Sequence, residues 1–74
     1  MIALRFDAVL KEWWIVTFSD GIAVAGQVYG DAKGRFPDRR WIMTSKVLTP
    51  RYKVVSGNVI QTRNSRYLLI GATN

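Results

Sequence analysis

The chain has 74 residues and a formal net charge of +6, and it contains neither cysteine nor histidine. This length gives room for one domain, residues 1–74, which must be supported without disulfides, by a dense aromatic and aliphatic core or by oligomerisation. Because zinc rarely accepts carboxylates alone, the composition argues against a zinc site, and no apolar run approaches the ~20 residues of a membrane-spanning helix.

The first half of the chain predicts short β-strands. Residues 2–10 alternate with the two-residue period of a half-buried strand, although an amphipathic helix is a competing interpretation of the same residues. Residues 13–18 are apolar on both faces and rich in β-forming side chains, which is typical of a central strand. Asp20-Gly21 suits a type I′ turn, so residues 13–18 and 22–29 are predicted to form a hairpin.

A long loop separates the two halves of the chain. Residues 30–40 contain two glycines, one proline and charges of both signs, and a loop of this length is more often functional than a simple connector. Strand patterns then return, interrupted by Pro50, which cannot donate to a ladder, and by a tight turn at Asn64-Ser65. These strands are expected at residues 41–48, 51–55, 59–63 and 67–70.

The succession of short strands and tight turns, with no helical pattern of comparable strength, predicts an all-β fold. At this size we expect a small, strongly bent antiparallel sheet of five to seven short strands that closes into an SH3-like or OB-like barrel.

The charge is distributed unevenly along the chain. No acidic residue follows Asp38, so the second half carries +7 and the first half −1. A half of the chain whose charged side chains are all basic suggests an anionic partner, most simply nucleic acid, an acidic protein face or a membrane surface. The basic side chains after Asp38 are Arg39, Arg40, Lys46, Arg51, Lys53, Arg63 and Arg66.

The sequence offers little for catalysis. Acid–base chemistry usually relies on histidine or on carboxylates with a tuned pKa, and this chain has no histidine and five carboxylates. Its serines have no evident partner to activate them as nucleophiles. We therefore expect no enzymatic activity, no cofactor and no metal.

The first basic and aromatic group lies in and beside the long loop. Four cations and two rings occur within nine residues, and phosphates attract such cations while unstacked bases stack on flat rings. An alternative is that the rings close one end of the barrel while the cations are solvated. The group comprises Lys33, Arg35, Phe36, Arg39, Arg40 and Trp41.

Two further basic groups follow. If the strand pattern near Pro50 holds, Arg51 and Lys53 share an outward face, although charges that protect an edge strand from aggregation explain this pair equally well. If the next turn has two residues, Arg63 and Arg66 face each other, which weakens a sheet locally and marks a candidate site. The alternative is that both guanidinium groups extend into water.

Two segments resemble the signatures of Sm-like RNA-binding proteins. Residues 14–31 (WIVTFSDGIAVAGQVYGD) are similar to the first signature, in which an apolar strand leads to Asp/Asn-Gly, a second glycine, an apolar residue and an aspartate. Residues 62–70 (TRNSRYLLI) are similar to the second signature, with Asn64 in place of a glycine. The resemblance implies a bent barrel that assembles into rings and binds uridine-rich RNA, with Arg63 and Asn64 lining the RNA site.

A second resemblance covers more of the chain. GRFPD at residues 34–38, TS at 44–45 and TR.S.YL at 62–68 look like a pattern in small uncharacterised proteins of phages and prophages. This resemblance implies a mobile-element protein. Because many small phage proteins disable a host factor by binding it, an inhibitor of host defence, similar in role to anti-CRISPR proteins, is an alternative function.

Together these observations predict a non-enzymatic basic module that acts in the cytoplasm, without membrane contact, and binds nucleic acid, RNA above all. The first alternative is an inhibitor that docks on an acidic host protein or nucleoprotein, and the second is a homo-oligomer that buries its exposed aromatic side chains between subunits. The predicted contact residues are Lys33, Arg35, Arg39, Arg40, Trp41, Lys46, Arg51, Lys53, Arg63, Asn64 and Arg66.

Overall fold

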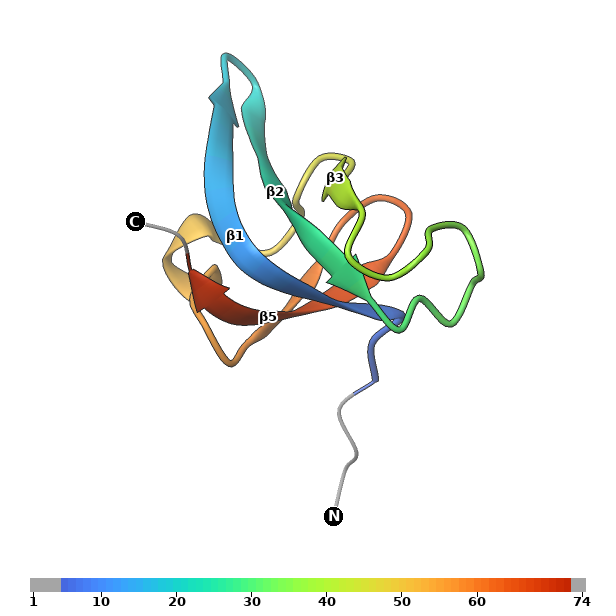
Figure 1. Cartoon of the computed structure of the whole chain (residues 1–74). Coiled ribbons are helices and arrows are strands. Elements are labelled where there is room, and N and C mark those ends of the chain that lie inside the picture. Colours follow the sequence, from blue (N-terminus) through green and yellow to red (C-terminus); the bar gives the residue numbers. More distant parts are fainter. Residues whose placement is uncertain (1–4, 73–74) are drawn as a thin grey trace.

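The computed structural model describes residues 5–72 and shows an all-β protein (Figure 1). Of the predicted strand at residues 2–10, the part from Ala8 onward is a strand, and residues 1–4 lie outside the described residues. The elements are β1 (Ala8–Phe18), β2 (Gly21–Tyr29), β3 (Trp41–Met43), the 3-10 helix η1 (Arg51–Lys53), β4 (Val59–Gln61) and β5 (Arg66–Ala72).

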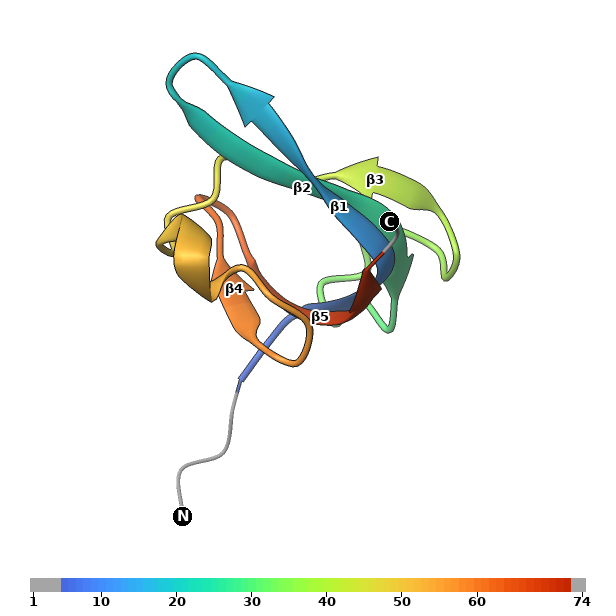
Figure 2. The ribbon, with the colours of Figure 1, turned by 90° about the vertical axis from the view of Figure 1, so that its left-hand side faces the viewer.

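The five strands form one bent sheet in the order β3-β2-β1-β5-β4, which confirms the predicted fold class (Figure 2). One detail of the prediction is wrong: β1 and β5 pair in parallel, whereas the other pairs are antiparallel, so the sheet is mixed. The sheet is also not closed into a barrel, since β3 and β4 are separate edges. Residues 47–48 connect β2 with β4, because Val47 N–H donates to Ile22 O on β2 and Leu48 N–H donates to Gln61 O on β4.

The concave face of the sheet carries the core. Leu10 pairs with Val28 on one side and Leu69 on the other, so the three buried side chains form one row across the sheet. Burying each side chain of this size stabilises the fold by about 1.5–3 kcal/mol. The remaining core side chains are Ala8, Trp13, Val24, Val47, Val54, Ile60 and Tyr67.

A β-bulge joins the two strands predicted at residues 2–10 and 13–18 into the single strand β1. Glu12 has a φ of 53°, and it lies with Trp13 opposite the single residue Gly26. The extra residue reverses which side chains face inward from that point on. Trp13 consequently enters the core at 5% exposure, and Trp14 projects from the outer face at 42% exposure. A Cβ on Gly26 would lie 3.0 Å from Lys11 O and 3.1 Å from Trp13 Cβ, so this residue leaves room for the bulge.

The predicted hairpin is confirmed, with its turn shifted by one residue. Phe18 pairs directly with Gly21, so the turn residues are Ser19 and Asp20, and Gly21 begins β2 with a φ of 152°. A Cβ there would lie 2.6 Å from Lys46 Cε, because the Lys46 side chain crosses over this glycine.

The strand predicted at residues 51–55 is wrong. Lys53 N–H donates to Pro50 O and Val54 N–H donates to Arg51 O, which are the i to i+3 bonds of a 3-10 helix. Pro50 precedes η1 with a φ of −55°, and the turn places Val54 in the core. Arg51 and Lys53 therefore do not share a strand face. The strand predicted at residues 41–48 is also shorter, since β3 ends at Met43.

Candidate polyanion-binding surface

The loop at residues 30–40 is built around one buried carboxylate. Asp31 accepts hydrogen bonds from the backbone N–H groups of Lys33, Arg35 and Phe36, at 3.1, 2.8 and 3.2 Å. The Arg35 guanidinium adds two more, from Nε and Nη2, both at 3.1 Å. The Asp31 side chain is 0% exposed, so this loop has a fixed internal structure.

These contacts set the charge state of Asp31. Burial alone would raise the pKa of the carboxyl, but the hydrogen bonds from the Arg35 side chain and from the backbone of Arg35 and Lys33 outweigh burial and lower the pKa to about 2. The same contact, chiefly the hydrogen bond to Asp31, raises the pKa of Arg35. Asp31 and Arg35 are therefore an ion pair at any pH above about 4.

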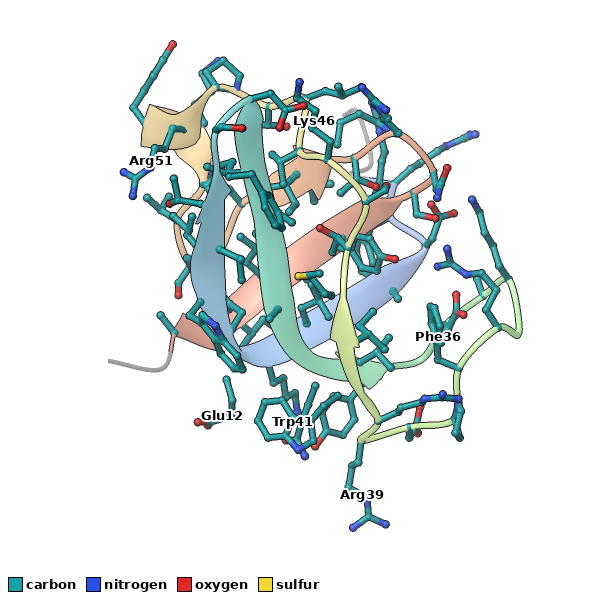
Figure 3. The ribbon with its side chains drawn as sticks, turned by 90° about the horizontal axis from the view of Figure 1, so that it is seen from above. Glu12, Phe36, Arg39, Trp41, Lys46 and Arg51 are labelled. Carbon is teal, nitrogen blue, oxygen red and sulfur yellow. The ribbon has the colours of Figure 1, made fainter. Side chains whose placement is uncertain are left out.

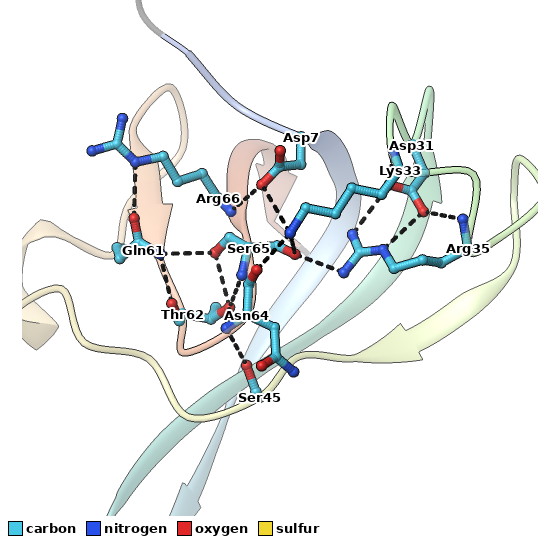
Figure 4. A network of polar contacts seen from close by, with 10 residues as sticks. All are labelled: Asp7, Asp31, Lys33, Arg35, Ser45, Gln61, Thr62, Asn64, Ser65 and Arg66. Carbon is cyan, nitrogen blue, oxygen red and sulfur yellow. Dashed lines mark hydrogen bonds and ion pairs between the residues drawn. The ribbon is translucent and has the colours of Figure 1, made fainter.

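The loop is attached to the turn between β4 and β5 (Figure 4). Arg35 Nη1 donates to Ser65 Oγ at 2.6 Å, and Lys33 Nζ donates to the same oxygen at 3.0 Å and to Asn64 O at 2.6 Å. Lys33 Nζ also lies 3.9 Å from a carboxylate oxygen of Asp7. Ser65, which the sequence did not single out as a contact residue, is the hub that brings the loop to this turn.

The turn between β4 and β5 is longer than predicted. Gln61 pairs with Arg66 and Thr62 N–H donates to Ser65 O, so four residues, 62–65, connect the strands. Arg63 and Arg66 are therefore not opposite each other. The prediction that they repel each other across the hairpin is wrong, so this repulsion does not mark a site. Instead Arg66 Nε donates to Gln61 Oε1 at 2.8 Å, as Figure 4 shows.

The other side of this turn packs on the segment that follows β3. Arg63 N–H donates to Lys46 O at 3.1 Å, and Asn64 N–H donates to Ser45 Oγ at 3.2 Å. Three segments that are far apart in the sequence thus meet at one place. We call this place the basic turn surface; it consists of Lys33, Lys46, Arg63, Asn64 and Arg66.

Several polar groups of the basic turn surface are available to a partner. Within residues 5–72, the Arg63 guanidinium, the Lys46 ammonium and the Asn64 side-chain amide make no hydrogen bond or ion pair. Arg66 uses its Nε and leaves both terminal nitrogens unbonded in the same part of the chain. Arg35, by contrast, is committed to Asp31 and Ser65.

The remaining predicted contact residues lie elsewhere. Arg39 and Trp41 are on the opposite side of the molecule from Lys46 in the view of Figure 3. Arg39 and Arg40 directly precede β3, where their backbone groups bond to Val28 and their side chains are exposed. Arg51 and Lys53 are exposed on η1, where Lys53 Nζ lies 5.8 Å from the centre of the Tyr52 ring. The acid-free half of the chain is therefore not one continuous patch.

Comparison with known protein families, curated proteins and solved structures found no match. The described part of the chain contains no helix long and apolar enough to cross a membrane. Residues 5–72 also contain no group of three or more side chains suited to hold a metal ion.

Proposed function

We propose that this protein binds nucleic acid, and RNA above all, through the basic turn surface. The observation that supports the proposal is convergence: Lys33 through its ammonium and Lys46 through its backbone oxygen contact the turn that carries Arg63 and leads into Arg66. Asp7, beside Lys33, is the one carboxylate within 4.0 Å of these cations in the described residues. Phosphate groups are the partner that such an excess of positive charge suits best.

The chemistry of the available groups fits RNA. The planar guanidinium groups of Arg63 and Arg66 can each bind a phosphate through two parallel hydrogen bonds, whereas Lys33 and Lys46 supply point charges. The Asn64 amide has both a donor and an acceptor, which is what the edge of an unpaired base requires. Arg63 and Asn64 are also the two residues that the resemblance to Sm-like proteins places at the RNA site.

The salt dependence of binding tests this proposal. We expect a fluorescently labelled single-stranded uridine oligomer to bind at low salt, with the logarithm of the association constant falling against the logarithm of the salt concentration. A slope of about −3 is expected if all four cations contact phosphates of a single strand. Fluorescence anisotropy measures the slope, with a hairpin RNA and duplex DNA titrated in parallel. No binding of any RNA or DNA at about 50 mM salt would refute the proposal.

The alternative partner is a host protein with an acidic face, met in the cytoplasm if the gene belongs to a phage. A pull-down from host lysate, read together with the nucleic-acid titration, separates the two. Capture of one stoichiometric protein from nuclease-treated host lysate, together with no affinity for nucleic acid, would replace the RNA proposal with that of an inhibitor.

A further inference from the structure

The outer face of the sheet, opposite the core, is unusually apolar. Trp14, Ala25 and Met43 form one row across β1, β2 and β3, because Ala25 pairs with both of the others. Paired residues in antiparallel strands project to the same side of a sheet. The neighbouring row places Trp41 beside Gln27, and Trp41 lies 5.9 Å from Trp14 between ring centres.

The large side chains on this face are exposed together rather than singly. Trp14 is 42% exposed, Trp41 55% and Met43 57%, and Phe18 on β1 and Ile70 on β5 extend the patch. Ala23 and Ala25 lie on the same face of β2 and are almost fully buried. Single exposed apolar residues are ordinary, but a contiguous patch marks an interaction surface.

The charges of the molecule lie mostly away from this face. Two cations of the described strands project from the outer face: Lys11, whose ammonium is 4.6 Å from the centre of the Tyr29 ring, and Arg66, which begins β5 beside Gln61. Arg39 lies at the margin beside Trp41, whereas Lys46 and Arg51 are on the far side (Figure 3). A polyanion would therefore meet the basic turn surface first. Two copies of a chain with net charge +6 would repel each other least through the apolar face.

We propose that the outer sheet face packs against the same face of a second copy in a two-fold symmetric dimer. Its five exposed apolar side chains present roughly 500 Å², given the size of aromatic side chains. With Val16, Tyr29 and the methylenes of Lys11 at the rim, the area approaches the ~800 Å² per partner of a standard interface. A dimer would also support a domain of this size, which lacks disulfides. The side of each copy that carries Lys46 would then face outward.

The test is the molar mass of nuclease-treated protein across a range of concentration. Light scattering from about 1 µM to about 500 µM should show a transition from 8.4 kDa to twice that mass. Met43→Lys should weaken the dimer by about tenfold or more, because it buries a charge within the contact. Leu48→Lys is the matched control, since Leu48 is 56% exposed and lies outside this face.

Circular dichroism melting should show that both variants are folded. A mass of 8.4 kDa at every concentration would overturn the proposal. Equal weakening by Met43→Lys and Leu48→Lys would overturn it as well, because the contact would then not be made by this face. If the chain stays monomeric and its outer sheet face binds a different protein instead, the dimer proposal is overturned as well.

Discussion

Asp31→Asn is expected to lower the free energy of unfolding by about 3 kcal/mol, the cost of removing one partner from a buried ion pair. The asparagine would keep the size of the side chain but replace one acceptor oxygen with a donor. The Arg35 guanidinium and three backbone N–H groups would then compete for one oxygen, where they now share two. Urea denaturation followed by tryptophan fluorescence measures the change.

The pH dependence of the same variant gives a sharper result. The pKa of Asp31 is about 2 in the folded protein and 3.8 ordinarily, so its contribution is complete above pH 4 and is lost as the pH falls towards 2. That difference corresponds to about 2 kcal/mol. The wild-type protein should therefore lose about 2 kcal/mol more than Asp31→Asn between pH 5 and pH 2.

Asp38→Asn in the same loop is the matched control. The Asp38 carboxylate is exposed and accepts one hydrogen bond, from Gly30 N–H at 2.8 Å, which an amide oxygen can still accept. We expect this variant to cost less than about 1 kcal/mol. Equal stability losses in the two variants would contradict the account of Asp31 as the centre of the loop.

The second large effect is expected on affinity. Arg63→Gln/Arg66→Gln should weaken RNA binding by about 100-fold at low salt, because two charge-assisted contacts to phosphate are lost. The salt slope should become shallower by about 1.4 on a single strand. Folding should be preserved, since within residues 5–72 the Arg63 side chain makes no hydrogen bond or ion pair and the Arg66 side chain makes one exposed hydrogen bond, to Gln61.

Arg39→Gln/Arg40→Gln removes the same charge from the other side of the molecule. If the basic turn surface carries binding, this control should lose only a few-fold in affinity through the lower net charge. Equal losses in the two double variants would mean that RNA responds to the overall charge and not to a site. Fluorescence anisotropy with one uridine oligomer compares all three proteins.

Local patterns predicted the strands and the hairpin because alternation and turn residues are visible in the sequence. The bulge at Glu12 was missed because a non-glycine residue with positive φ leaves no sequence signal. Its consequence, the reversal that sends Trp13 inward and Trp14 outward, was therefore missed as well. The alternating charges at residues 51–53 predict a strand as readily as the 3-10 helix that forms there.

The site depends on tertiary contacts that spacing does not encode. Lys33 and Arg35 are more than 25 residues from Ser65, and their meeting rests on side-chain hydrogen bonds to one hydroxyl. Arg35 was expected to contact a partner because its buried acceptor, Asp31, looked like an ordinary loop carboxylate. The charges and the resemblance point to Arg63, Asn64 and Arg66, but they do not predict the four-residue turn that holds Arg63 and Asn64 and leads into Arg66.

NMR mapping of the RNA contact distinguishes binding through the basic turn surface from binding elsewhere on the molecule. Titration of a uridine oligomer into ¹⁵N-labelled protein should shift the backbone amides of Lys46, Arg63, Asn64 and Arg66 most strongly. The amides of Arg39 and Trp41, on the other side of the molecule, should move little. The largest shifts at residues 39–43, or shifts spread evenly over the surface, would contradict binding through the basic turn surface.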